Sequence, residues 1–268
     1  MKTTYYTFPA YMRAIIIIVF IVSIFVGIQH SIAQIYPTSE KVAIIIDPKN
    51  KQNITGHLQI ALAWGDLLRP PLALQRGVIH LKEAMNRYTK VNTIVDKHLV
   101  LGSNQLLNMP FVFVTSREKF NLTETEKNNV KRYFDMGGFM VLDNAEPLGE
   151  NSRGGASLKQ MLRDTIPNAR FQPIPNNHEL YHCFFDFTDG PPNGAEIGLF
   201  GRDGRKIMSK QRLYLEGVWH RGRLVAVYSD KGYIIKWNES SNNEPQLKIG
   251  VNMIIYALTH EGGMTNKY

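Results

Sequence analysis

The hydrophobic positions of the chain fall into short continuous runs and into longer segments with helical spacing. Residues 111–115, FVFVT, and residues 139–143, FMVLD, are apolar up to a polar last residue. Such runs are typical of strands that are buried on both faces of a parallel sheet. Residues 42–46, 57–64 and 91–95 are further strand candidates, so strands are predicted throughout the first half of the chain.

The segments between these runs have apolar residues at helical spacing. After Pro70-Pro71, residues 74, 78, 81, 85 and 88 are apolar and would lie on one face of a helix. A second helix is predicted from the capping box of Thr123 and Glu126 to the glycine pair at 137–138. Two more helices are expected, at residues 158–166 and in the last segment, where residues 247, 251, 254 and 258 are apolar.

This alternation of strands and helices predicts an α/β fold with an open, mainly parallel sheet and helices on both faces, in flavodoxin-like layers. The C-terminal third adds a β-hairpin, because residues 211–219 and 223–230 have strand character and flank a turn. The sequence PKNKQN, after residue 47, is predicted to be a loop. We therefore predict a leader at residues 1–33, a strand and loop at 34–56, and a single α/β domain at 57–268.

Residues 14–28 form an apolar run that follows Lys2 and Arg13 and precedes small residues at Ser31 and Ala33. This order is that of a secretory signal peptide. The run is also shorter than the ~20 residues that a membrane-spanning helix needs. We therefore expect a cleaved signal peptide and an exported protein, periplasmic or associated with the envelope. The alternative is a single-pass anchor, with membrane association through residues 14–28.

The composition adds a basic net charge to this picture. The 268 residues carry a formal charge of +8, and the part after the two leader cations carries +6. Outside the cytoplasm such a charge favours an anionic surface or an acidic protein as partner over nucleic acid. Basic residues gather before and in the predicted hairpin, where a solvated loop is the alternative interpretation. They are Arg202, Arg205, Lys206, Lys210, Arg212, Arg221 and Arg223.

Residues 178–182 contain the H-E-x-x-H motif of zinc metalloproteases. That motif works on a helix, which places both imidazoles on one face. The surroundings do not favour a helix, because Pro173 and Pro175 stand upstream and residues 189–192, DGPP, end the segment. We therefore expect no metal at His178 and His182 and no cofactor, and a zinc protease is the least favoured function.

Polar residues follow the predicted parallel strands, and the carboxyl ends of such strands are where open α/β sheets bind ligands. Asp143 is the first candidate, because a carboxylate at the end of a buried strand is unfavourable unless it is paired or functional. Each candidate also has a structural interpretation, as a helix cap, a loop hydroxyl or a hydrogen-bonded core histidine. The residues expected to converge on this rim are Asp66, Ser116, Asp143, Asn144, His178 and His182.

Three blocks of the sequence resemble a bacterial family known as domain of unknown function 4159. They are residues 109–144, which end in GGFMVLDN, residues 178–192, HELYHCFFDFTDGPP, and residues 217–233, GVWHRGRLVAVYSDKGY. The resemblance covers most of residues 57–260 and implies a fold similar to glutamine amidotransferases and trehalose-utilisation proteins. It implies a fold more than a function, because the activity of the family is not established. Members commonly have a proline where this chain has Glu179, which argues against an essential base for a zinc-bound water.

An amidotransferase needs a cysteine nucleophile on a sharp turn between a strand and a helix. Cys183, the single cysteine, does not follow such a strand and is expected to be a small buried residue. The favoured function is therefore a binding or interaction module rather than an enzyme, with a protein or small-molecule ligand at the carboxyl edge of the sheet. The alternative is a hydrolase that acts on a sugar-related or amide substrate through Asp143, His178 and Ser116.

Overall fold

The computed structural model describes residues 43–47, 50–147, 152–196, 198–200, 206–208 and 212–265. Within the chain, residues 42–268 form one compact unit. The predicted leader at residues 1–33 lies outside the described residues. Among the helices that are described, none is both long enough and apolar enough to cross a bilayer.

Eight strands form one mixed sheet, and five of them are parallel to one another in its centre. Their order across the sheet is β3-β2-β4-β5-β10, which becomes the flavodoxin-like order 2-1-3-4-5 when the five are numbered along the chain. The five strands are β2 (Asn50–Trp64), β3 (Lys90–Val100), β4 (Phe111–Ser116), β5 (Phe139–Asn144) and β10 (Arg223–Ser229).

Antiparallel strands complete the sheet at its margins. β9 (Glu216–His220) pairs with β10, and the short β6 (Gln172–Pro173) pairs with β9. The two residues of the β9–β10 turn, Arg221 and Gly222, have φ angles of 52° and 79°, as in type I′ hairpin turns. β1 (Ala43–Asp47) pairs with the first half of β2, and β7 (Gly198–Phe200) pairs with β8 (Lys206–Met208) in a separate ribbon.

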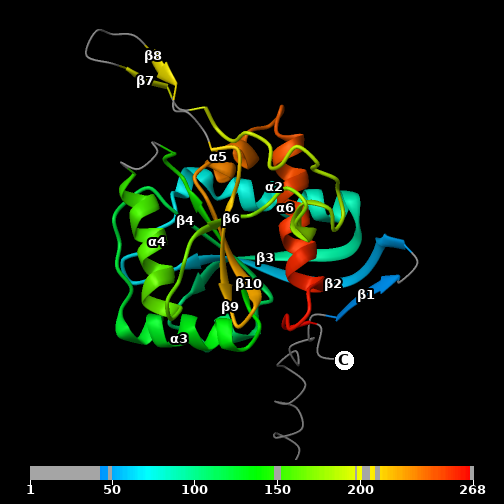
Figure 1. The fold of residues 1–268 in the computed structure, drawn as a ribbon, viewed down its shortest axis with the longest axis horizontal. Helices are drawn as coiled ribbons and strands as arrows, with labels where there is room; N and C mark the ends of the chain where they lie inside the picture. The colour runs from blue at the N-terminus through cyan, green and yellow to red at the C-terminus, as the bar shows by residue number, and fades with distance from the viewer. Residues whose placement is uncertain are drawn as a thin grey trace, which may run out of the picture. The chain divides into compact units, whose positions relative to one another are not determined.

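Helices cover both faces of the sheet, as Figure 1 shows. One face carries α2 (Arg76–Tyr88), α5 (Tyr233–Asn238) and α6 (Glu244–Thr259), and the other carries α3 (Glu124–Asp135) and α4 (Arg153–Thr165). Strand β5 supplies both cores, because Phe139 and Val141 face one layer while Met140 and Leu142 face the other. Short 3-10 turns lie at η1 (Leu72–Leu74), η2 (Asn104–Asn108) and η4 (Glu179–Tyr181). The predicted α/β class is confirmed.

Several predicted boundaries were wrong. The first strand of the hairpin, β9, begins at Glu216 instead of residue 211. Residues 50–53 belong to β2 rather than to a loop, because β1 pairs with this part of β2 through Asp47 and Asn50. Helix α4 begins at Arg153 instead of residue 158. Its first turn contains Gly154 and Gly155, which have a low helix propensity. Position 154 nevertheless has room only for glycine, because a side chain there would meet the carbonyl oxygen of Ser116 at 2.4 Å.

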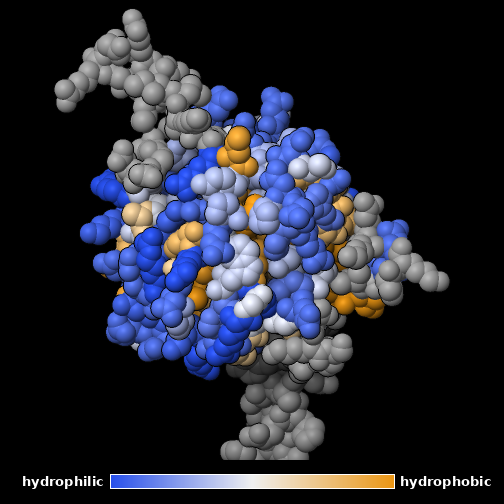
Figure 2. All heavy atoms as spheres, viewed as in Figure 1, coloured by the Kyte–Doolittle hydropathy of each residue, from blue (hydrophilic) through white to orange (hydrophobic). Residues whose placement is uncertain are grey.

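The strand register brings distant polar residues to one edge of the sheet. Leu62 pairs with Phe113, Phe113 with Val141, and Thr115 with Asp143. The ends of β2, β4 and β5 therefore meet at the carboxyl edge, as the sequence predicted. The surface of the domain seen in Figure 2 is largely hydrophilic, with the hydrophobic spots separated from one another.

Glu126 joins the end of β2 to the start of α3. It is 2% exposed and forms the predicted capping box with Thr123, whose backbone N–H donates to Oε2 at 2.8 Å. The hydroxyl of Thr123 donates to the same oxygen, and the backbone N–H of Asp66 donates to Oε1 at 2.8 Å. One buried carboxylate therefore satisfies donors from two separate elements.

Replacing Glu126 by alanine leaves these donors without their acceptor. We expect the free energy of unfolding to fall by about 2–4 kcal/mol, because hydrogen bonds to a buried charge are among the stronger ones, and urea denaturation would measure it. Glu124→Ala is the matched control, because this side chain lies in the same helical turn and is 83% exposed. A loss for Glu124→Ala as large as that for Glu126→Ala would contradict the prediction.

Candidate functional site

Four polar residues at the carboxyl edge of the sheet are buried and form hydrogen bonds within the domain. Thr115, Ser116, Asp143 and Asn144 are each at most 1% exposed. The hydroxyl of Thr115 donates to the backbone oxygen of Asp143, and that of Ser116 donates to the backbone oxygen of Glu118. The Ser116 hydroxyl therefore stabilises the turn that follows β4. These contacts fit the interpretation of Ser116 as a loop hydroxyl.

Asp143 supports the start of α5. Its Oδ2 accepts a hydrogen bond from the backbone N–H of Ile234 at 2.9 Å, while its Oδ1 is buried without a partner in the described part of the chain. Burial raises the pKa of Asp143 to about 7, against the opposing effect of the hydrogen bonds from Ile234, Ser229 and Tyr233. The carboxyl group is therefore held near its point of titration.

The other two candidates at this edge, Asn144 and Asp66, also have local roles. The side-chain oxygen of Asn144 accepts from the hydroxyl of Ser152, the N-cap of α4, at 2.8 Å. Its amide nitrogen is buried and has no hydrogen-bond partner among the described residues. Asp66 is exposed just after β2. As ligand-binding residues, Asp66, Ser116, Asp143 and Asn144 stay predictions.

His178 does not join these residues, which corrects the predicted convergence on one rim. It lines a pocket with Gly222 and Arg223, at the start of β10, whereas Asp143 pairs with Ser229 at the end of the same strand. The strand of seven residues between them spans about 20 Å. Ser116, His178 and Asp143 therefore do not form a catalytic triad.

The H-E-x-x-H segment forms a single 3-10 turn instead of an α-helix, with His178 before Glu179 and His182 after Tyr181. The Nε2 of His182 donates to the backbone oxygen of Asn176 at 2.7 Å, and its Nδ1 contacts Asp186. The Asn176 carbonyl and the Asp186 carboxylate raise the pKa of His182. His182 is thus engaged locally, and no cluster in the described ranges has the three His, Cys, Asp or Glu side chains that a metal would need.

Asn252, on α6, holds this segment against the domain. Its side-chain nitrogen donates to the backbone oxygens of Leu180 and Phe185, and its oxygen accepts from the N–H of Phe185 at 2.8 Å. The Sγ of Cys183 lies 3.3 Å from the backbone oxygen of Asn252. Cys183 is buried as expected, and the clamp by Asn252 fixes the position of His178.

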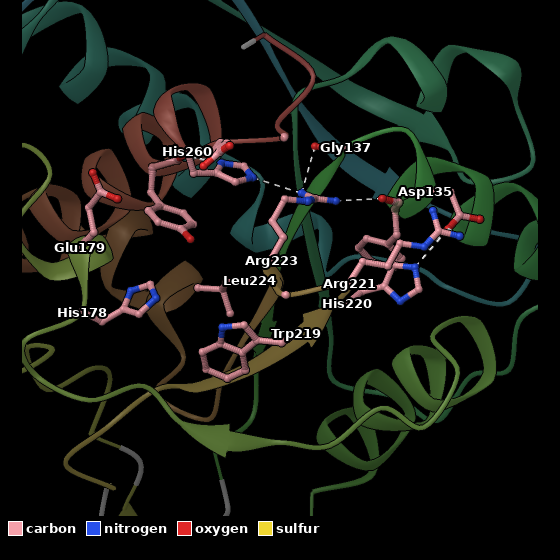
Figure 3. A pocket seen from close by; sticks show the side chains of 15 residues that line it. Asp135, Gly137, His178, Glu179, Trp219, His220, Arg221, Arg223, Leu224 and His260 are labelled. Carbon is pink, nitrogen blue, oxygen red and sulfur yellow. Dashed lines mark hydrogen bonds and ion pairs between the residues drawn. The ribbon is translucent and has the colours of Figure 1, made fainter. Parts of the chain in front are cut away.

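A pocket of about 600 Å³ opens at the amino ends of β5 and β10. Figure 3 shows it between η4, the β9–β10 hairpin and the ends of α3 and α6. Polar and aromatic side chains dominate its walls. The lining residues are Phe134, Asp135, Gly137, His178, Glu179, Trp219, His220, Arg221, Gly222, Arg223, Leu224, Tyr256, His260, Glu261 and Gly262.

Aromatic rings form one wall of the pocket. The ring of His178 lies 6.3 Å from that of Trp219 and 5.5 Å from that of Tyr256. Trp219 lies across Gly217, because a side chain at Gly217 would meet the indole at 2.5 Å. Burial, followed by the charge of Glu179, raises the pKa of Tyr256 to about 12, so its hydroxyl stays protonated at neutral pH.

His178 presents a hydrogen-bond donor to this pocket. Its Nδ1 accepts from the backbone N–H of Leu180 at 3.1 Å, so the neutral ring carries its proton on Nε2. Burial lowers the pKa of His178, although the nearby carboxylate of Glu179 opposes this. In the part of the chain that the structure describes, no residue forms a hydrogen bond with this Nε2.

Arg223 connects the end of α3 to the end of α6. Its guanidinium donates to the backbone oxygens of Phe134, Gly137 and Gly138, and to Nε2 of His260 at 3.1 Å. Nδ1 of His260 donates to the backbone oxygen of Tyr256 at 2.7 Å, which leaves Nε2 as an acceptor. Burial, assisted by the nearby guanidinium, lowers the pKa of His260. This ring is therefore neutral at neutral pH.

The sequence pointed to His178 as a candidate at the wrong edge of the sheet, and it gave no indication of most of the other pocket residues. Trp219, Arg221 and Arg223 stand in the block GVWHRGRL, whose pattern indicates a hairpin, a basic charge and the family resemblance, but no pocket. A tryptophan beside a turn at the end of a hairpin was the available signal. His260 and Glu261 follow the last helix and carry no motif at all.

These features define an α/β domain of flavodoxin-like strand order, with buried polar residues at the carboxyl edge and an open polar pocket at the amino edge. The model of the family described as "Domain of unknown function (DUF4159)" matches residues 72–258, and the chain belongs to this family. No curated protein matches the sequence. The further likeness to amidotransferases stays a prediction.

Asp143 gives the protein a pH-dependent stability of defined sign. Its pKa rises from 3.8 to about 7 on folding, so from pH 4 to pH 7 the folded state holds a proton that the unfolded state has lost. The stability contributed by this group is therefore complete below about pH 4, falls as the pH rises from 4 to 7, and is lost above pH 7. We expect the loss to be about 2–4 kcal/mol.

Urea denaturation at pH 5 and pH 8 would measure this loss, and Asp143→Asn should remove it. Asp66→Asn, at an exposed position, is the matched control and should keep the pH dependence of the unchanged protein. The same difference between pH 5 and pH 8 in Asp143→Asn as in the unchanged protein would show that the titrating group lies elsewhere.

Proposed function

We propose that the protein is an exported binding module, periplasmic or associated with the envelope, and that its ligand is a small molecule held in the amino-edge pocket. The observation that carries the proposal is the Nε2–H of His178, which faces the pocket and forms no hydrogen bond with another described residue. A donor held in position on a pocket wall is the kind of group that orients a ligand.

The size and chemistry of the pocket support this function. Its volume of about 600 Å³ falls in the range of small-molecule sites. Trp219 and Tyr256 supply aromatic surface, while Glu179, Arg221 and Glu261 supply exposed polar groups at the margin. Such a combination binds a small ligand by ring contact and directs it by hydrogen bonds.

The positions of Ser116 and Cys183, the two nucleophiles considered from the sequence, support binding over catalysis. The hydroxyl of Ser116 donates to a backbone carbonyl, and Cys183 is buried with its sulfur against the backbone oxygens of Leu180 and Asn252. Neither residue lines the pocket that His178 lines. The pocket therefore contains a recognition group without either of these nucleophiles.

An anionic surface or acidic protein as a second partner stays a prediction. In the predicted basic cluster, Arg212 forms an ion pair with Glu216, and Arg221 forms one with Asp135. Arg223 donates a hydrogen bond to a backbone oxygen at the end of α3. These three cations are therefore largely compensated within the domain. The side chains of the other four members lie outside the described residues.

Binding can be tested by titrating four probes into the protein expressed with its own N-terminal segment. The probes are choline, glucosamine, glucose and inorganic phosphate, followed by calorimetry up to about 10 mM. We expect at least one to bind at one site per chain. His178→Ala and Trp219→Leu should each weaken that binding by about tenfold or more, which corresponds to the loss of one good contact.

His57→Ala is the matched control, because His57 is exposed on β2 and does not line the pocket. It should bind the probe as the unchanged protein does. Circular dichroism of the three variants would verify that each is folded. If none of the four probes binds, or if binding survives both pocket substitutions, the protein is not a small-molecule module of the proposed kind.

A further inference from the structure

Three side chains of the pocket wall hold hydrogen-bond donors that the domain itself does not use. They are the Nε2–H of His178, the hydroxyl of Tyr256 and the indole N–H of Trp219. None of the three donates to another of the described residues. The buried side-chain atoms without a hydrogen-bond partner in the described ranges belong to other residues, so these three donors are open to solvent and to a ligand.

The hydroxyl of Tyr256 is the least expected of these donors. Tyr256 is only 6% exposed, and a tyrosine so deeply buried usually pairs its hydroxyl with an acceptor. Its ring is fixed, because it stacks on the ring of His260 at 4.9 Å and lies 5.5 Å from that of Phe139. A fixed hydroxyl with no partner among the described residues indicates that its acceptor comes from outside the domain.

The three donors belong to rings that are close neighbours. The ring of His178 lies 5.5 Å from that of Tyr256 and 6.3 Å from that of Trp219. Figure 3 shows His178 and Trp219 next to each other in the pocket. His178 therefore stands between the other two rings, and a single small ligand can accept hydrogen bonds from more than one of them.

The charges of the pocket favour a neutral ligand for these donors. His178 is uncharged at neutral pH, because burial lowers its pKa. Arg221 forms an ion pair with Asp135, and the guanidinium of Arg223 donates to backbone oxygens at the end of α3 and in the turn after it. An anion would therefore find these cations already engaged. An ammonium group carries donors only and would leave the three donors of the wall unmatched.

The indole of Trp219 adds an apolar face beside the donors, because Trp219 is partly exposed and lines the pocket. A pyranose ring matches both features, since its C–H bonds form a flat apolar face and its oxygens accept hydrogen bonds around the rim. Sugar hydroxyls also donate, and the exposed carboxylate of Glu261 lies at the margin of the pocket as an acceptor. Donors, acceptor and apolar face thus fit one kind of molecule.

We propose that the ligand of this pocket is a neutral sugar, whose pyranose ring lies against Trp219 and whose oxygens accept hydrogen bonds from His178 and Tyr256. The inference rests on the proposed function and narrows its ligand to one chemical class. The hydroxyl of Tyr256 is the group that tests it most directly, because phenylalanine removes this donor and keeps the ring.

Glucose and cyclohexylmethanol provide the test, because both have a six-membered ring with a hydroxymethyl group and only glucose has further oxygens. Calorimetry on the protein with its own N-terminal segment should show glucose binding at least about tenfold more tightly than cyclohexylmethanol, choline or inorganic phosphate. Tyr256→Phe should weaken glucose binding by about three- to tenfold, the loss of one hydrogen bond. Its stability to urea should stay unchanged, because this hydroxyl has no partner among the described residues.

Tyr214→Phe is the matched control, because it removes the hydroxyl of a tyrosine that does not line the pocket. It should bind glucose as the unchanged protein does. Equal binding of glucose and cyclohexylmethanol, unchanged glucose binding in Tyr256→Phe, or a preference for choline or phosphate over glucose would overturn this inference and leave the binding module intact. Absence of binding by every probe would overturn both.

Discussion

The parallel pairing of β5 with β4 and β10 determines how the rest of the domain is arranged. Residues 139–142 are completely buried, because helices cover the sheet on both sides of this strand. Polar chemistry is therefore confined to the two ends of the strand. At one end, the carboxylate of Asp143 accepts a hydrogen bond from the N–H of Ile234. At the other, the guanidinium of Arg223 donates hydrogen bonds to backbone oxygens at the end of α3 and in the turn after it. The two edges of the sheet differ because the starts of α4 and α5 contact the polar residues of the first, whereas a pocket opens at the second.

Much of this fold was predictable, because its strongest signals are local. Buried runs such as residues 111–115 have few alternatives, and the capping box at Thr123 uses groups three residues apart. The errors occurred where tertiary contacts override propensity. The start of β2 depends on pairing with β1, and the start of α4 accepts Gly154 because the carbonyl of Ser116 leaves no room for a side chain.

The candidate site was less predictable than the fold. Register places Thr115 beside Asp143, so polar residues that end neighbouring parallel strands were correctly expected at one edge. His178 follows β6, which is only two residues long, so the strand rule did not apply to it. Its position depends on Asn252, 74 residues further along the chain, whose side chain holds residues 180–185. No spacing in the sequence encodes such a contact.

The net charge of the chain does not describe the charges that a ligand would meet in the pocket, which has a physical reason. A formal charge of +8 describes the whole chain, but cations such as Arg221 and Arg212 are compensated by neighbouring acids. Net charge acts over a Debye length, about 8–10 Å at physiological salt, whereas hydrogen-bond donors and ring faces act on contact. Recognition in the pocket would therefore arise at short range, from the ring of His178 and the aromatic wall of Trp219 and Tyr256.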